Sequence, residues 1–148
     1  MTEGMLVVIG VLFIAAILTG MLTRKNTAKN HDEHGIPFGF EENYAVALEP
    51  CKDGKTLLYD LTTCRHCARL QEFLTLHGVE YNDVVVDRYI GKARSEIVEK
   101  LKSYNPRVSF PTAVFPDGTV IVGYRETLLL EEVERLKEAG LINSEKNK

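Results

Sequence analysis

Two cysteines separated by two residues carry the clearest chemistry in this sequence, Cys64 and Cys67 in the run Thr-Cys-Arg-His-Cys-Ala. A cysteine at the start of a helix has its thiolate stabilised by free backbone N–H groups and by the positive end of the helix dipole. A second cysteine three positions on lies one turn further along the same side, close enough to form a disulfide. The spacing therefore predicts Cys64 as the nucleophile and Cys67 as the resolving thiol of a thiol–disulfide exchange.

The two residues between the cysteines are basic. Arg65 and His66 add positive potential, which we expect to lower the pKa of the Cys64 thiol and to stabilise the reduced pair. A metal-binding module is the alternative use of the same thiols. A structural zinc site needs four ligands, so Cys51 or a histidine would have to converge on this pair. No metal site is expected on this basis.

The third cysteine, Cys51, lies 13 residues before Cys64 and has no obvious partner. Three interpretations remain open for it: an inert buried thiol, a regulatory partner for Cys64, or an intermolecular bridge.

A second motif, Ser-Phe-Pro-Thr at 109–112, comes just before a predicted strand. If the peptide bond before Pro111 is cis, the Phe110 backbone would present its N–H and C=O groups beside the cysteines. A substrate peptide could then pair with that backbone as an added strand.

The surrounding sequence alternates between strand and helix patterns. The expected elements are strands at 56–60, 80–86, 112–115 and 119–122, helices at 64–76 and 92–104, and a last helix capped by Thr127. Pro-Asp-Gly at 116–118 predicts a hairpin turn, and 44–48 a short extra strand. The order β-α-β-α-β-β-α, with the cysteines where the first strand turns into the first helix, indicates an α/β thioredoxin-like fold with a mixed four-stranded sheet.

The N-terminus predicts a membrane anchor. Met5 to Leu22 is an uncharged apolar run whose helix would be about 27 Å long, enough to span a bilayer. A cleaved signal peptide is the alternative, but Glu3 precedes the run and no Ala-x-Ala pattern follows it. The expected domains are therefore an anchor at 1–22, a polar tether at 23–43 in which the histidines are solvated, the redox domain at 44–142 and a polar tail at 143–148.

Basic residues follow the anchor and none precedes it, which predicts a single-pass protein of the cell membrane with its redox domain in the cytoplasm. A periplasmic orientation is the alternative. The chain has 148 residues and a net charge of −3, so it has room for one sizeable domain and offers no basic surface for nucleic acid.

Two stretches of the sequence, LYDLTTCRHCARLQEFLTLHGVEYNDVVVD and NPRVSFPTAVFPDGTVIVGYRE, resemble the glutaredoxin family of the thioredoxin superfamily over residues 55–139. The resemblance implies Cys64 as nucleophile, Cys67 as resolving cysteine and Pro111 as a cis-proline. It also implies disulfide-containing protein clients, no tightly bound cofactor, and substrate contacts at Phe110, Pro111, Thr112, Gly123 and Tyr124.

Several positions depart from the usual glutaredoxin pattern. Leu61 stands where a lysine is common, and Gly123-Tyr124 is followed by Arg125-Glu126 instead of an acidic pair. The Gly-Tyr-Arg run is more similar to ribonucleotide-reductase-associated redoxins, which take electrons from thioredoxin reductase. The expected electron source is therefore either glutathione or thioredoxin reductase. The expected function is reduction of protein disulfides by a membrane-tethered oxidoreductase.

Overall fold

The computed structural model describes residues 30–142. The predicted anchor at 1–22, the first residues of the predicted tether and the polar tail at 143–148 lie outside this range. Among the residues that are described, no helix has the length and apolar character needed to cross a membrane.

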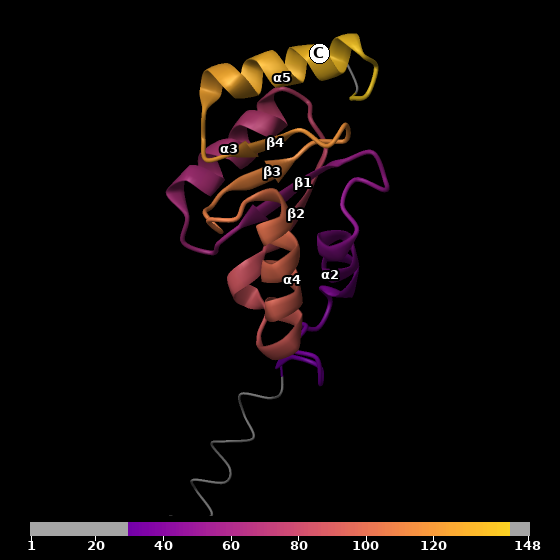
Figure 1. The fold of residues 1–148 in the computed structure, drawn as a ribbon, viewed down its shortest axis with the longest axis vertical. Helices are drawn as coiled ribbons and strands as arrows, with labels where there is room; N and C mark the ends of the chain where they lie inside the picture. The colour runs from indigo at the N-terminus through magenta and orange to yellow at the C-terminus, as the bar shows by residue number, and fades with distance from the viewer. Residues whose placement is uncertain (1–29, 143–148) are drawn as a thin grey trace, which may run out of the picture.

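A mixed four-stranded sheet forms the centre of the domain (Figure 1). Its strands are β1 (Thr56–Asp60), β2 (Tyr81–Val85), β3 (Thr112–Val114) and β4 (Val120–Val122), in the order β2-β1-β3-β4. β1 and β2 run parallel, whereas β3 is antiparallel to both β1 and β4. This is the thioredoxin-like α/β arrangement that the order of sequence patterns predicts.

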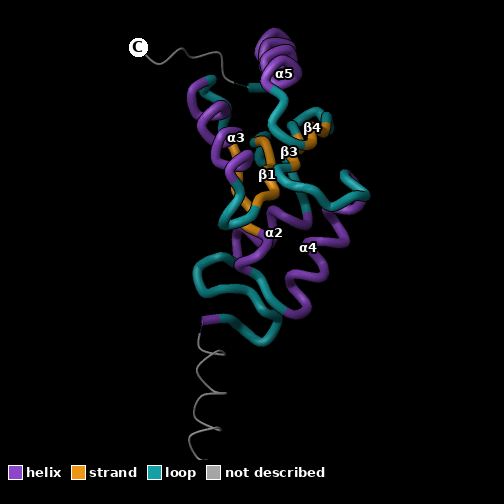
Figure 2. Tube along the Cα trace, turned by 90° about the vertical axis from the view of Figure 1, so that its left-hand side faces the viewer, coloured by secondary structure: helices purple, strands orange, loops and turns teal. Residues whose placement is uncertain are grey.

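Helices cover both faces of the sheet (Figures 1 and 2). They are α2 (Glu41–Leu48), α3 (Arg65–Leu76), the short helix η2 (Val86–Arg88), α4 (Gly91–Tyr104) and α5 (Glu126–Glu138). Successive side chains of a strand point to opposite faces, so Leu58 packs with α3 and α5 while Leu57 and Tyr59 pack with α2 and α4. Both layers hold fully buried residues, and the sheet is therefore covered on each side.

The extra strand predicted at 44–48 is wrong, because these residues belong to helix α2. The run Tyr-Ala-Val-Ala-Leu fits both periods over so short a length. The helix starts at Glu41, within the predicted tether, where two glutamates suit the positive helix end. Ala47 is fully buried, and its carbonyl accepts a hydrogen bond of 2.7 Å from the Tyr59 hydroxyl.

The last part of the predicted tether lies against the domain. The Ile90 and Ala93 N–H groups, at the start of α4, donate to the carbonyls of Gly35 (3.0 Å) and His34 (2.9 Å), and Ile36 is buried. These bonds satisfy helix N–H groups that the α4 N-cap side chain does not reach. The polar composition of this segment does not indicate this packing, because the groups that bind α4 are backbone carbonyls.

The composition of the tether suggested a solvated His31, but this residue contacts the domain. Its ring Nε2 hydrogen-bonds to the Arg88 carbonyl at 2.8 Å, and the adjacent Nδ1 is buried. The segment from residue 30 to 40, called the N-terminal strap below, is thus fixed to both η2 and α4.

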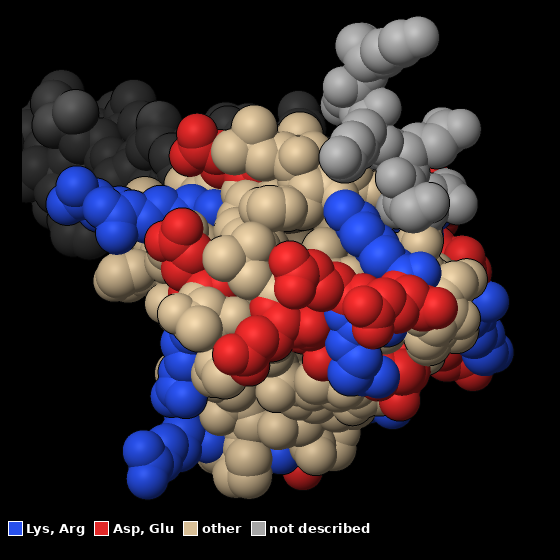
Figure 3. Space-filling view, turned by 90° about the horizontal axis from the view of Figure 1, so that it is seen from above, with Lys and Arg blue, Asp and Glu red and all other residues tan. Residues whose placement is uncertain are grey.

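Helix α5 differs from prediction in two details. Thr127 is not its cap, because the helix begins at Glu126 and no side chain caps it at Arg125. In addition, the charged side chain of Glu132 is buried instead of facing solvent, and it accepts two hydrogen bonds from Arg135 at 2.6 and 3.1 Å. Seen from the α5 end, acidic and basic groups are interspersed over the outer surface (Figure 3).

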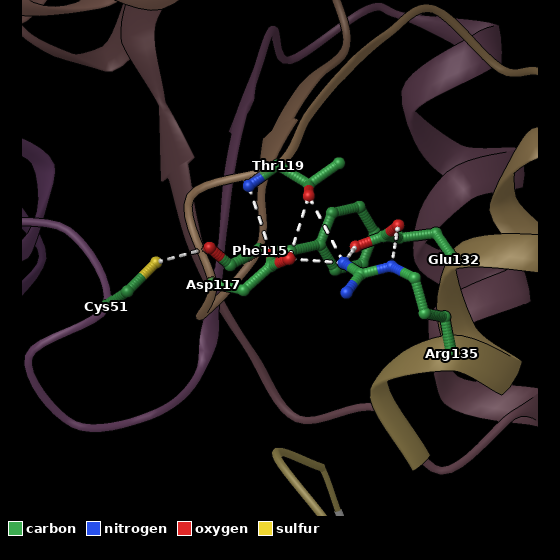
Figure 4. Close-up of polar contacts among 6 residues, drawn as sticks. All are labelled: Cys51, Phe115, Asp117, Thr119, Glu132 and Arg135. Atoms are coloured by element: carbon green, nitrogen blue, oxygen red, sulfur yellow. Dashed lines mark hydrogen bonds and ion pairs between the residues drawn. The ribbon is translucent and has the colours of Figure 1, made fainter. Parts of the chain in front are cut away.

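Arg135 also joins α5 to the β3–β4 hairpin. Its guanidinium forms an ion pair with Asp117 in the turn and contacts the Thr119 hydroxyl at 3.3 Å (Figure 4). The Pro-Asp-Gly turn itself is confirmed, since the Phe115 N–H donates to the Thr119 carbonyl at 2.8 Å. Although partial burial opposes ionisation, hydrogen bonds from Thr119 and Arg135 lower the pKa of Asp117.

Candidate active site

Cys64 and Cys67 form a disulfide at the start of α3, with their Cα atoms 5.2 Å apart. Cys64 is the N-cap of this helix, and its Sγ accepts a hydrogen bond from the Cys67 N–H at 3.2 Å. Cys64 is half-buried, whereas Cys67 is only 2% exposed. The sulfur that meets solvent is therefore the one beside the helix N–H groups, which is the arrangement that the sequence predicts for nucleophile and resolving thiol.

The side chains of Arg65 and His66 are exposed on the first turn of α3. Their expected effect on the Cys64 thiolate stays a prediction. The loop before Cys64 is held from the other side, because the Asp87 carboxylate accepts hydrogen bonds from both the N–H and the hydroxyl of Thr62 at 2.9 Å. Sequence patterns gave no hint of this contact.

The loop before β3 contains the second predicted motif, and the Phe110–Pro111 peptide bond is cis, as expected. Thr112 is paired with Tyr59 in the antiparallel register, so the preceding residues lie beside the end of β1 that leads to Cys64. Both loops are seen at the same end of the sheet in Figure 1. Phe110 is partly exposed there.

Asn105 fixes this loop from within, a role that the sequence did not reveal. Its amide nitrogen donates to the Ser109 carbonyl (3.0 Å) and to the Thr112 hydroxyl (2.9 Å). Thr112, predicted to contact substrate, is fully buried, and its hydroxyl donates to the Ser109 carbonyl at 2.8 Å. Its side chain therefore shapes the loop and cannot touch a substrate unless the loop opens.

The remaining predicted contacts lie on both sides of this loop. The Gly123 N–H donates to the Pro111 carbonyl at 2.8 Å, so Gly123 adjoins the cis-proline. Gly123 has a φ of 78°, which disfavours other residues. The Tyr124 ring instead meets Phe73 of α3 edge-on, with centroids 6.4 Å apart. It borders a hollow of about 330 Å³ further along α3.

A cavity of about 200 Å³ lies on the other side of the disulfide. Cys64, Cys67 and Leu61 line it together with polar residues that the sequence patterns did not point to, among them Asp60, Asp83, Gln71 and Arg88. The Gln71 amide nitrogen donates to Asp60 Oδ2 at 2.6 Å and to Asp83 Oδ2 at 3.3 Å. The two carboxyl groups are thus neighbours, and the Oδ1 atom of each is buried without a partner.

Burial, followed by the proximity of Asp83, raises the pKa of Asp60 to about 8. Burial also raises the pKa of Asp83, although Arg88 opposes the shift. Asp60 therefore keeps its proton at neutral pH. The strand register contained the signal: Leu58 pairs with Asp83, so Asp60 and Asp83 lie on one face of two parallel strands.

Cys51 lies at the opposite end of the sheet. Its Sγ is 3.4 Å from the Val114 carbonyl and 3.5 Å from that of Phe115 (Figure 4). The length of β1, roughly 13 Å at 3.3 Å per residue, separates this end from Cys64. Burial raises the pKa of the Cys51 thiol. Of the three interpretations of Cys51, the structure favours a half-buried, weakly reactive thiol.

Between residues 30 and 142, no three His, Cys, Asp or Glu side chains are grouped so as to hold a metal ion. The metal-binding alternative thus gains no support from the geometry of this part of the chain.

Comparisons with known proteins agree with the site geometry. The glutaredoxin family model matches residues 56–121. Among solved structures, a glutaredoxin from Methanosarcina mazei Go1 is 41% identical, with a TM-score of 0.50, over 54% of this chain and 78% of its own. The glutaredoxin (grx-1) from Archaeoglobus fulgidus is 36% identical, with a TM-score of 0.50, over 55% and 86% of the two chains.

Methanoredoxin from Methanosarcina acetivorans is 35% identical, with a TM-score of 0.51, over 54% of this chain and 84% of its own. No curated protein gives a match. With a Cys-x-x-Cys disulfide at the tip of α3 and relatives of this identity and coverage, the chain belongs to the glutaredoxin family and is a dithiol–disulfide oxidoreductase.

Proposed function

We propose that this oxidoreductase reduces disulfides of protein clients while its N-terminal residues 1–22 tether it to a membrane. The observation that carries the redox part is the contrast between the two sulfurs. Cys64 is accessible and receives a helix N–H, whereas Cys67 is buried one turn further in.

The exchange follows from this contrast. In the reduced protein, the Cys64 thiolate attacks one sulfur of the client disulfide, which forms a mixed disulfide and releases the other client sulfur as a thiolate. Cys67 then loses its proton and attacks Cys64 Sγ. The client's second sulfur leaves as a thiolate, and Cys64–Cys67 closes as the disulfide found in the structure.

The client segment is proposed to pair with the backbone of Phe110 as an added strand. Phe110 is partly exposed next to the cis-proline and at the end of the sheet where Cys64 lies. Gly123 extends this surface, because its N–H is bonded to the Pro111 carbonyl. Tyr124 would contact parts of the client further along α3.

The electron source is proposed to be thioredoxin reductase, with glutathione as the alternative. Leu61 stands where a lysine is common in the family and so offers no cation for a carboxylate of glutathione. Arg88 is the one cation among the residues that line the cavity beside the disulfide, and the carboxyls of Asp60 and Asp83 share that cavity with it. The rates at which thioredoxin reductase and glutathione reduce the oxidised protein, each supplied with the same concentration of reducing equivalents, would distinguish the two. Faster reduction by glutathione would reverse this choice.

Trapping tests the redox mechanism. Cys67→Ser should accumulate a covalent adduct with a disulfide-containing client, because Cys64 still attacks and nothing resolves the product. Cys64→Ser should form none, and Cys51→Ser should behave as wild type. Non-reducing electrophoresis followed by mass spectrometry measures the adduct. A failure of Cys67→Ser to form adducts, together with a wild type that reduces no disulfide, contradicts the proposal.

Membrane attachment and orientation need their own test. The proposal expects the full chain to remain with membranes after a high-salt wash, and a reporter fused after Lys148 to be active on the cytoplasmic side. A reporter active only in the periplasm would support the alternative orientation. Release of the chain into the soluble fraction would remove the tether from the proposal.

A further inference from the structure

The buried carboxyl pair formed by Asp60 and Asp83 has no part in the exchange described so far, yet it shares a cavity with both cysteines. Asp60 is 2% exposed, and its Oδ1 has no partner. On α3, Cys67 and Gln71 are four residues apart and therefore lie one above the other on the same face. Gln71, which holds both carboxyl groups, thus places them one turn below the resolving sulfur.

Cys67 needs a proton when the disulfide opens, and the cavity offers a source for it. When the disulfide opens, the electron pair of the S–S bond goes to Cys67 Sγ, and because Cys67 is only 2% exposed, bulk water has little direct access to this sulfur. A buried thiolate without a partner is costly. A cavity of about 200 Å³ with polar walls has room for water between this sulfur and the carboxyl pair.

We propose that the Asp60–Asp83 pair is the proton store of Cys67, donating a proton when the disulfide opens and accepting it when the disulfide closes. This assignment rests on the proposed function, since it concerns the same exchange.

The steps balance as follows. An external thiolate attacks Cys64 Sγ and forms a mixed disulfide, the Cys64–Cys67 bond breaks, and Cys67 leaves as a thiolate. Cys67 takes the proton held between Asp60 and Asp83, and the doubly ionised pair regains a proton from solvent through the cavity. In the closing direction, the pair first releases its proton to solvent through the cavity, Cys67–SH then gives its proton to the doubly ionised pair, and the Cys67 thiolate displaces the client from Cys64. No oxidant or reductant besides the two thiol partners is required.

The charged groups around the pair are consistent with one stored proton. Burial raises the pKa of Asp60 to about 8, close to that of a thiol, so proton transfer between them is nearly balanced. Asp87, from η2, adds to the upward shift of Asp60, while Arg88, from the same element, lowers the pKa of Asp83. The buried hydroxyl of Tyr89 is also near, since Asp83 helps to raise its pKa to about 12. From α2, Asn43 binds only the Asp83 carbonyl, at 2.8 Å.

The test is single-turnover opening of the oxidised full-length protein by dithiothreitol from about pH 5.5 to 9.5. Acid quenching, alkylation and mass spectrometry give the rate, which is divided by the fraction of dithiothreitol present as thiolate. The wild-type rate should be flat at low pH and fall as pH passes about 8, where the stored proton is lost. Asp60→Asn should be at least about tenfold slower at pH 6 and show no fall near pH 8.

Charge alone cannot produce this result. At pH 6 the protonated Asp60 carboxyl and the amide that replaces it in Asp60→Asn are both neutral, so the two proteins differ in a transferable proton. Asp83→Asn should keep a proton on Asp60 at low pH but move the fall in rate to lower pH, because the neighbouring carboxyl no longer raises the pKa of Asp60. Asp53→Asn, at the Cys51 end, should match wild type.

A wild-type rate and pH profile in folded Asp60→Asn, or an equal change in Asp53→Asn, would overturn the proton-store assignment while leaving the proposed function intact. A wild-type disulfide that no thiol opens would instead sink the proposed function. If Asp60→Asn does not fold, infrared spectroscopy of the oxidised wild type decides. A protonated carboxyl band should be present at pH 6 and lost above pH 8, and its absence at pH 6 rejects the store.

Discussion

At the scale of single residues, the Asp60 side chain lowers the free energy of unfolding increasingly as pH rises. Burial and the neighbouring Asp83 raise its pKa to about 8, whereas in the unfolded chain the value is near 3.9. Between these values the folded protein holds a proton that the unfolded chain has released. The stability due to this proton is fully present below pH 4 and is lost as pH rises to about 8.

Asp60→Asn should therefore gain stability relative to wild type with increasing pH. The substituted amide would keep an acceptor for Gln71 and remove the ionisation, and we expect a relative gain on the order of 3 to 4 kcal/mol between pH 5 and pH 8. Urea unfolding of both proteins at the two pH values measures it. An unchanged difference across this range would show that Asp60 does not titrate with a raised pKa.

At the scale of elements, the loop between α4 and β3 depends on one buried amide. Asn105 is 5% exposed and donates to Ser109 and Thr112, which fixes the turn that precedes Pro111. Without that amide, the carbonyl and hydroxyl oxygens of Ser109 and the buried hydroxyl of Thr112 would lose a donor.

Asn105→Ala is expected to lower the free energy of unfolding by about 2 kcal/mol, because it leaves buried acceptors unpaired. It should also slow exchange with protein disulfides more than exchange with dithiothreitol, since the proposed client-binding backbone at Phe110 follows this loop. Asn82→Ala, which removes an exposed hydrogen bond to Asp53, is the matched control and should change neither rate. Equal effects of Asn105→Ala on both substrates would remove Phe110 from client binding.

Patterns that repeat along one element were readable from the sequence, whereas contacts between distant elements were not. The cysteine spacing and the Pro-Asp-Gly turn are local, and they predicted α3 and the β3–β4 hairpin correctly. The Asp60–Asp83 pair depends on the register of two strands that the whole of α3 separates in the sequence. The burial of Glu132 is likewise not readable from α5 alone, because it depends on Arg135 and on the hairpin that Arg135 contacts.

At the scale of the whole molecule, the N-terminal strap is part of the folded domain. Its close approach to α4 depends on Gly35, where a Cβ would lie 2.0 Å from the Ile90 carbonyl oxygen. Gly39 has a similar positive φ, but a Cβ there would meet nothing within 4 Å. A substitution at either glycine would therefore strain the backbone, but only a substitution at Gly35 would also clash with Ile90.

Gly35→Ala should detach the strap, while Gly39→Ala should show only the smaller cost of its φ. We expect the free energy of unfolding of Gly35→Ala to be lower than that of Gly39→Ala by at least about 1 kcal/mol. Limited proteolysis should cut Gly35→Ala faster between residues 30 and 40. Equal cleavage of the two variants would mean that the strap is not held by this contact.

The His31–Arg88 hydrogen bond has a geometric consequence. Arg88 borders the cavity that contains the cysteines, so the polypeptide enters the domain on the catalytic side. An anchor at residues 1–22, as proposed, would therefore be joined to the domain on the same side as Cys64. Under that proposal, we expect a client whose disulfide lies close to the membrane surface to be reduced faster than a client whose disulfide lies far from it.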